Sequence, residues 1–135
     1  MNASRFLIPQ IISVLLLAGR LTATAAETPA ADTQKERAVS ALEQDLKADP
    51  NNAELWVHLG FAQRKMGKLD DAQRAFEKAA ALNPRATEAL YMLGLIYESK
   101  HDQKAAEKAW KDYLAAETDA EKRAVAEKHI HHLTQ

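Results

Sequence analysis

Histidines near the C-terminus are the first side chains in this chain that could do chemistry. His129 and His132 are spaced so that, on a helix, they would lie one turn apart and could share a metal ion. A working metal site would need a third ligand and a fixed outer shell of partners, and no acidic residue lies one turn further along. We therefore predict no metal site and no bound cofactor.

The other reactive residue types do not form a catalytic arrangement. The chain has no cysteine, and no glycine-rich loop follows a predicted strand. Glu and Asp alternate with Lys and Arg along predicted helices, which is typical of a solvated face. Trp56 and Trp110 could stack on a ligand, but aromatic residues at helical spacing usually fill a core. We predict no catalytic residues and no enzymatic activity.

The elements that carry these side chains repeat at a spacing of 34 residues. The matched pairs are Pro50 and Pro84, Glu54 and Glu88, Leu59 and Leu93, Gly60 and Gly94, Ala72 and Ala106, Ala75 and Ala109, and Phe76 and Trp110. Apolar residues within each block fall at helical spacing. A period of this size is typical of a helix-turn-helix solenoid, so we predict an all-α fold that presents surfaces for binding.

Two blocks of the sequence resemble tetratricopeptide repeats. The positions that carry the resemblance are Trp56, Leu59, Gly60, Ala72, Phe76, Ala79 and Pro84 in the first block, and Leu90, Leu93, Gly94, Tyr97, Ala106 and Trp110 in the second. Upstream, Ala38 and Leu42 precede Pro50 as Ala72 and Phe76 precede Pro84, which resembles the second half of a further repeat. The resemblance therefore implies a half repeat over residues 35–52 and full repeats over residues 53–86 and 87–117. Residues 118–135 have a thin apolar face, which predicts a capping helix with a polar outer side.

The sequence also sets expectations about where helices end and begin. His101 replaces the turn glycine seen at Gly67, and Gln63 stands where the family usually has an aromatic residue. Asn51 and Thr118 are each followed by a Glu at capping-box spacing. We therefore predict that helices begin at Asn51 and Thr118.

The resemblance implies a place for a partner, because the first helix of each tetratricopeptide repeat lines a concave groove. The groove face here comprises Glu54, Val57, His58, Phe61 and Arg64 from the first repeat, and Glu88, Tyr91, Met92, Leu95 and Glu98 from the second. Family members that clamp a peptide's terminal carboxylate use Lys and Asn in this groove. This chain has Val57, Phe61 and Leu95 there, so that activity is not implied. We expect an exposed apolar strip that binds another protein, a second copy of the chain, or the chain's own terminal elements.

Residues 1–25 have the layout of a secretory signal peptide. Arg5 and Arg20 are the only charged residues, the run from Phe6 to Ala18 is mostly apolar, and Ala23-Thr24-Ala25 offers a cleavage site. The apolar run is shorter than the roughly 20 residues of a membrane span, although an uncleaved anchor remains the alternative. Residues 26–34 are polar and lack periodicity, which predicts a flexible tether.

Charge and leader together restrict the class of function. Cleavage of the leader removes two arginines and lowers the formal net charge from −1 to −3, and this mild acidity disfavours nucleic acid as a partner. We predict an exported adaptor or scaffold, periplasmic or secreted and most consistent with a bacterial envelope. It would bind a protein or peptide through the concave groove, without stable membrane insertion after cleavage. The alternative is a structural or regulatory subunit that acts as a homo-oligomer.

Overall fold

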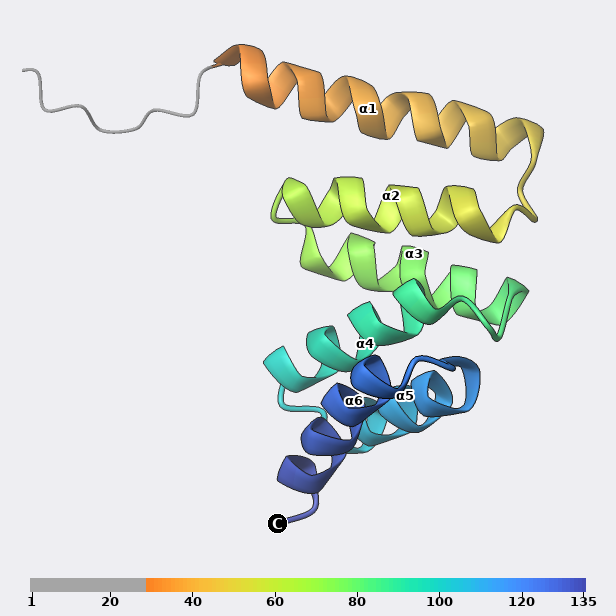
Figure 1. Ribbon diagram of the computed structural model, residues 1–135. Coiled ribbons are helices and arrows are strands. Elements are labelled where there is room, and N and C mark those ends of the chain that lie inside the picture. Colours follow the sequence, from red (N-terminus) through yellow and green to blue (C-terminus); the bar gives the residue numbers. More distant parts are fainter. Residues whose placement is uncertain (1–28) are drawn as a thin grey trace, which may run out of the picture.

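The structure is a computed structural model that describes residues 29–135. Six helices follow one another in this part of the chain: α1 (Pro29–Ala48), α2 (Ala53–Lys65), α3 (Leu69–Leu82), α4 (Thr87–Ser99), α5 (Gln103–Ala116) and α6 (Ala120–Leu133). Each helix packs on the next, so the helices form a single stack with α1 at one end and α6 near the other (Figure 1). The predicted all-α solenoid is confirmed.

The described chain contains two helical hairpins, α2–α3 and α4–α5. In each of them an aromatic side chain of the second helix packs against a glycine of the first. A Cβ atom at Gly60 would lie 2.7 Å from Cε1 of Phe76, and a Cβ atom at Gly94 would lie 2.5 Å from Cε2 of Trp110. Both aromatic side chains are 0% exposed. The close packing of the paired helix therefore offsets the roughly 1 kcal/mol that Gly costs in a helix relative to Ala.

Both hairpins turn through the same backbone motif. His101 has a φ of 59°, and Gly67, at the matching position, has a φ of 74°. The N–H of His101 donates to the carbonyl of Glu98 at 2.9 Å, and the N–H of Asp102 donates to the carbonyl of Tyr97 at 2.9 Å. The same pair of bonds closes the turn at Gly67, and together they form a Schellman motif. His101 therefore holds a left-handed conformation that costs a non-glycine residue roughly 1–2 kcal/mol.

The predicted helix starts at Asn51 and Thr118 are wrong by one residue. Asn52 caps α2, where its side-chain oxygen accepts hydrogen bonds from the backbone N–H groups of the second and third helical residues at 3.1 and 3.3 Å. Asp119 caps α6 in the same way at 2.9 and 3.0 Å. A capping oxygen must reach these amides, which places the cap directly before the first helical residue.

The N-terminal boundary differs from the prediction. Helix α1 begins at Pro29, so residues 29–34, which the sequence analysis assigns to a tether, are helical. Proline is favoured at the first helical position, and Asp32 places a negative charge in the first turn. As a result α1 has 20 residues, whereas α3 has 14. The predicted signal peptide and residues 26–28 lie outside the described part of the chain.

The residues that carry the repeat signature mostly form the core. Those that are buried are Leu59, Gly60, Ala72, Phe76, Ala79, Leu90, Leu93, Gly94, Ala106 and Trp110. Trp56 is half-buried, and its indole N–H donates to the carbonyl of Pro50 at 2.9 Å. Tyr97 is half-buried too, and its hydroxyl donates to Oε1 of Glu77 at 2.7 Å. These bonds tie α2 to the loop before it and α4 to α3, whereas Pro84 is exposed in the α3–α4 loop.

Candidate partner-binding groove

The predicted apolar strip is shorter than expected. Val57 and Met92 are 5% and 6% exposed, and both belong to the core cluster that contains Phe76 and Ile96. They were expected to be exposed on the concave face, but their helices lie close enough to the neighbouring hairpin to cover them. Val57 and Met92 therefore contribute to the floor of the concave face and not to an exposed strip.

The aromatic side chains of the concave face are half-buried and packed on the core by their edges. The ring of Phe61 meets that of Phe76 with centroids 5.2 Å apart and an interplanar angle of 79°. The ring of Tyr91 meets Trp110 at 5.2 Å and 83°, and Tyr113 at 5.6 Å and 57°. The edge-to-face contacts of Phe61 with Phe76 and of Tyr91 with Trp110 hold the two rings of the concave face in fixed orientations. Phe61 and Tyr91 therefore each present a fixed ring to the concave face.

The predicted charged residues divide between different places. Glu54, His58, Arg64 and Glu88 are exposed. Glu88 lies beside the aromatic residues, and Glu54 lines an adjoining hollow that Glu88 shares. Arg64 lies at the other end of α2, where it lines a separate hollow with residues of α1. The groove therefore carries two of the predicted glutamates at one end, and Arg64 is not part of that site.

Helix α6 covers the remaining part of the predicted groove. Glu98 was expected at an open rim, but its Oε1 accepts a hydrogen bond from Nε1 of Trp110 at 2.8 Å. The same oxygen lies 2.9 Å from Nδ1 of His129, whose ring stacks on the indole with centroids 4.3 Å apart. Leu95 packs against the cluster that includes Ala126 of α6. Glu98 and Leu95 therefore hold α6 in place and do not line an open groove.

What remains is a cleft of about 430 Å³ between α2, α4 and the start of α6. Its lining residues are Phe61, Thr87, Glu88, Tyr91, Met92, Tyr113, Glu117, Lys122 and Val125. Val125 is one of two large apolar side chains that are exposed in the described part of the chain, with an exposed fraction of 39%. Helix α6 therefore forms one wall of the cleft.

The sequence analysis missed Tyr113, Glu117, Lys122 and Val125 as groove residues. A signal for two of them was present, because Lys122 and Val125 follow Glu88 and Tyr91 at the repeat spacing of 34 residues. Helix α6 therefore occupies the place that the first helix of a third repeat would take.

Hydrogen bonds at the α5–α6 turn influence the protonation states of two side chains that line the cleft. Oε1 of Glu117 accepts from the backbone N–H groups of Thr118 and Asp119 at 2.9 and 3.0 Å, and Oε2 accepts from the hydroxyl of Tyr113 at 3.2 Å. The bond from Asp119 is the largest cause that lowers the pKa of Glu117. Burial, followed by the bond to Glu117, raises the pKa of Tyr113 to about 12. At neutral pH the cleft therefore contains an ionised Glu117 and an uncharged Tyr113.

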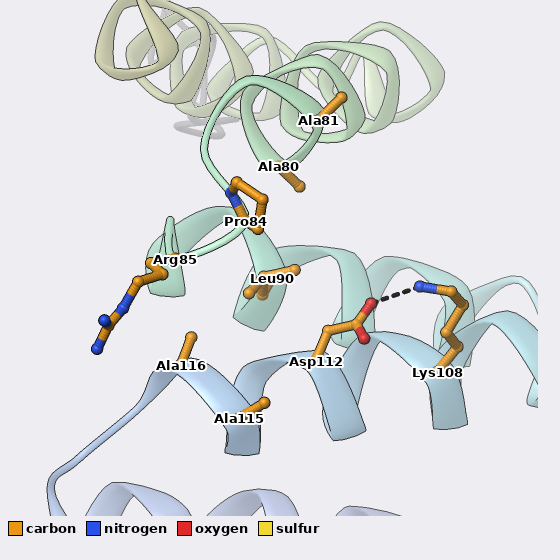
Figure 2. Close-up of a pocket in the computed structure, with 9 residues that line it drawn as sticks. All are labelled: Ala80, Ala81, Pro84, Arg85, Leu90, Lys108, Asp112, Ala115 and Ala116. Carbon is orange, nitrogen blue, oxygen red and sulfur yellow. Dashed lines mark hydrogen bonds and ion pairs between the residues drawn. The ribbon is translucent and has the colours of Figure 1, made fainter.

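A second hollow, of about 710 Å³, lies between α3 and α5 on the outer side of the hairpins (Figure 2). Small side chains line it, among them Ala80, Ala81, Ala115 and Ala116. One rim holds the ion pair between Lys108 and Asp112, with Nζ and Oδ2 2.6 Å apart. No aromatic side chain lines this hollow, so the concave cleft is the stronger candidate for binding an apolar segment.

Two further features of residues 29–135 bear on the candidate functions. No cluster of three or more His, Cys, Asp or Glu residues in this range is placed to hold a metal ion. No helix in this range is both long and apolar enough to cross a lipid bilayer. Of the two histidines spaced one helical turn apart, His129 has a structural role, because its ring lies against Glu98 and Trp110.

The sequence matches known repeats over more than half of its length. Two sequence models of the tetratricopeptide repeat match this chain, one over residues 59–128 and the other over residues 41–74. The chain belongs to the tetratricopeptide repeat family. The buried glycines and aromatic residues of the two hairpins are thus the repeat's own packing positions.

Curated relatives share these repeats but are much longer. Superkiller complex protein 3 of Mus musculus is 34% identical over 65 residues, which is 48% of this chain and 4% of that protein. Anaphase-promoting complex subunit 3 of Schizosaccharomyces pombe is 28% identical over 76 residues, which is 56% of this chain and 11% of that protein. The chain thus spans only a small part of the length of these relatives.

Solved structures with the same arrangement are closer to this chain in size. MamA superposes with a TM-score of 0.64 at 27% identity, over 76% of this chain and 58% of that chain. The translocator chaperone SycD of Yersinia enterocolitica gives 0.67 at 13% identity, over 76% and 74%. The first tetratricopeptide domain of Spaghetti gives 0.62 at 22% identity, over 77% and 82%. At these identities the last two likenesses show the fold alone.

Proposed function

We propose that this tetratricopeptide repeat protein is an exported, non-catalytic adaptor that binds a segment of another protein in the concave cleft. The observation that carries the proposal is the group of exposed and half-buried apolar side chains in the cleft, formed by Phe61, Tyr91 and Val125. Apolar side chains gathered in one hollow and bordered by charges are typical of a binding surface.

Related structures support the proposal of a protein partner. The Spaghetti domain is described as bound to an HSP90 peptide, and SycD is described as a chaperone for a type III secretion translocator. These are properties of those proteins, and they come to this chain only through the shared helix stack. The cleft of this chain has its own lining, in which Tyr113 and Val125 provide apolar contacts.

Export is the second part of the proposal. It rests on the basic and apolar leader with its small-residue cleavage site at Ala23-Thr24-Ala25. Mass spectrometry of the protein recovered from the envelope fraction tests it, and we expect a new N-terminus next to Ala25 or Ala26. An intact Met1 in the membrane fraction would instead show that the leader is an anchor.

A site-specific photo-crosslinker tests the binding cleft. Placed at Val125, it should capture a partner protein in cells, whereas the same group at Glu127 should not. Glu127 is a matched control because it is exposed on the same helix and lies two residues on, which turns it to the other side of α6. Equal capture from both positions would mean that the cleft is not the binding site. Capture of the protein itself at Val125 would favour the homo-oligomer.

A further inference from the structure

Two carboxylates at one end of the concave cleft have no ion-pair partner among the described residues. Glu88 lines the cleft, and Glu54 lines the adjoining hollow of about 310 Å³. Both side chains are exposed, and neither makes a hydrogen bond through its carboxylate or an ion pair within residues 29–135. They lie at the N-terminal ends of α2 and α4 and follow each other at the repeat spacing. Among the described residues, this end of the groove therefore carries two carboxylates that form no ion pair.

The positive charges near the cleft lie on both sides of it, one on α6 and one beside Glu54 and Glu88. Lys122 stands on the α6 wall, close enough to Glu117 for its charge to contribute to the lowered pKa of that carboxyl. Arg85 lines the same hollow as Glu54 and Glu88 but forms an ion pair with neither. The α6 wall is therefore balanced within the chain, whereas the edge formed by Glu54 and Glu88 has two carboxylates and one guanidinium.

We propose that the cleft selects a peptide segment in which an apolar side chain lies within a few residues of a lysine or arginine. The apolar side chain would contact Phe61, Tyr91 and Val125, and the cation would meet Glu88 and Glu54. Complementary charge at a groove edge fixes the orientation of a bound segment and rejects segments of the wrong sign. This inference rests on the proposed function, and adds the chemistry and direction of the partner.

A display selection with random short peptides on the full exported chain tests the proposal. We expect the enriched peptides to combine large apolar residues with Lys or Arg. A labelled peptide from that pool should bind the variant Glu54→Gln/Glu88→Gln about twofold to thirtyfold more weakly, since the variant removes two exposed charge pairs. This difference should shrink at about 0.5 M salt, where exposed charges are screened.

Two single variants sharpen the test. Arg85→Gln removes the competing cation, so it should strengthen binding of the same basic peptide. Glu127→Gln removes an exposed carboxylate of α6 away from the cleft, so it should leave binding unchanged. If Glu127→Gln weakens binding as much as the double variant, net charge and not the groove edge selects the peptide, and the proposal is overturned.

The possible failures are distinguishable. Enrichment of apolar peptides without a basic residue, or with acidic residues, would overturn the charge selection and leave the proposed adaptor function intact. If the selection on Val125→Glu enriches the same peptides as the selection on wild type, the cleft binds none of them. Both the adaptor function of the cleft and its charge selection are then wrong. If light scattering shows a dimer that Val125→Glu dissociates, a second copy fills the cleft and the partner proposed here is wrong.

Discussion

Gly94 packs directly against the indole ring of Trp110, where a Cβ atom would lie 2.5 Å from Cε2. The indole is 0% exposed and cannot move aside freely. Gly94→Ala should therefore lower the free energy of unfolding by about 1–3 kcal/mol through overpacking. Helix propensity alone predicts the opposite sign, a gain of about 1 kcal/mol, so thermal melting distinguishes the two effects. In a Trp110→Leu background the alanine should be less harmful, because the smaller side chain leaves room.

The turn at His101 should be improved by glycine. His101 has a φ of 59° in the position that Gly67 fills in the preceding hairpin. His101→Gly removes the cost of the left-handed conformation but adds the backbone entropy of glycine, and the balance should stabilise the protein by up to about 1 kcal/mol. Gly67→Ala should destabilise it by a similar amount. Urea denaturation measures both, and a loss of stability in His101→Gly would mean that the imidazole makes a contribution of its own.

The packing between paired helices could be predicted from the sequence, and most of the groove could not. Gly60 and Phe76 contact within one hairpin, so the repeat encodes their pairing locally. Whether Val57 and Met92 are covered depends on how tightly successive hairpins pack, and the repeat pattern does not specify that. The bond between Glu98 and His129 joins residues from different repeats, and neither belongs to the repeated pattern.

The cleft variants separate binding from folding. Val125→Glu should abolish partner binding while helicity and melting temperature stay near the wild-type values, because Val125 is 39% exposed. Phe76→Glu should unfold the protein, because it places a charge at a site that is 0% exposed. Leu95→Glu should destabilise the second repeat together with α6, since Leu95 packs against both the core cluster around Phe76 and the cluster formed with α6. Circular dichroism with a binding assay tests all three, and unfolding of Val125→Glu would show that the cleft is part of the core.

The α5–α6 turn should become less stable in acid. The backbone N–H of Asp119, and then that of Thr118, lower the pKa of Glu117 in the folded state. The ionised Glu117 therefore contributes to the free energy of unfolding above the ordinary carboxyl pKa of about 4.3. This contribution is lost as the pH falls through the lower pKa of the folded state. Glu117→Gln should melt below wild type at neutral pH, and the gap should close in acid. A gap that is constant with pH would mean that the charge of Glu117 does not matter.

Glu98 should hold α6 on the second repeat. Its Oε1 accepts from Nε1 of Trp110 at 2.8 Å and lies 2.9 Å from Nδ1 of His129. Glu98→Ala leaves the indole N–H without an acceptor beside a ring that is 0% exposed, which should lower the free energy of unfolding by about 1–3 kcal/mol. Glu98→Gln is the matched control, because its side-chain oxygen can still accept from the indole.

Hydrogen exchange shows whether the effect of Glu98→Ala is local. Contacts in a helical repeat stack join neighbours only, so the amides of α6 should lose protection before those of α2 and α3. His129→Ala should also reduce the protection of α6. Its effect on the free energy of unfolding should be smaller in the Glu98→Ala background than in wild type, because the two residues share one contact. If every helix lost protection together, the stack would unfold as one unit, and α6 would not be a separately held wall of the cleft.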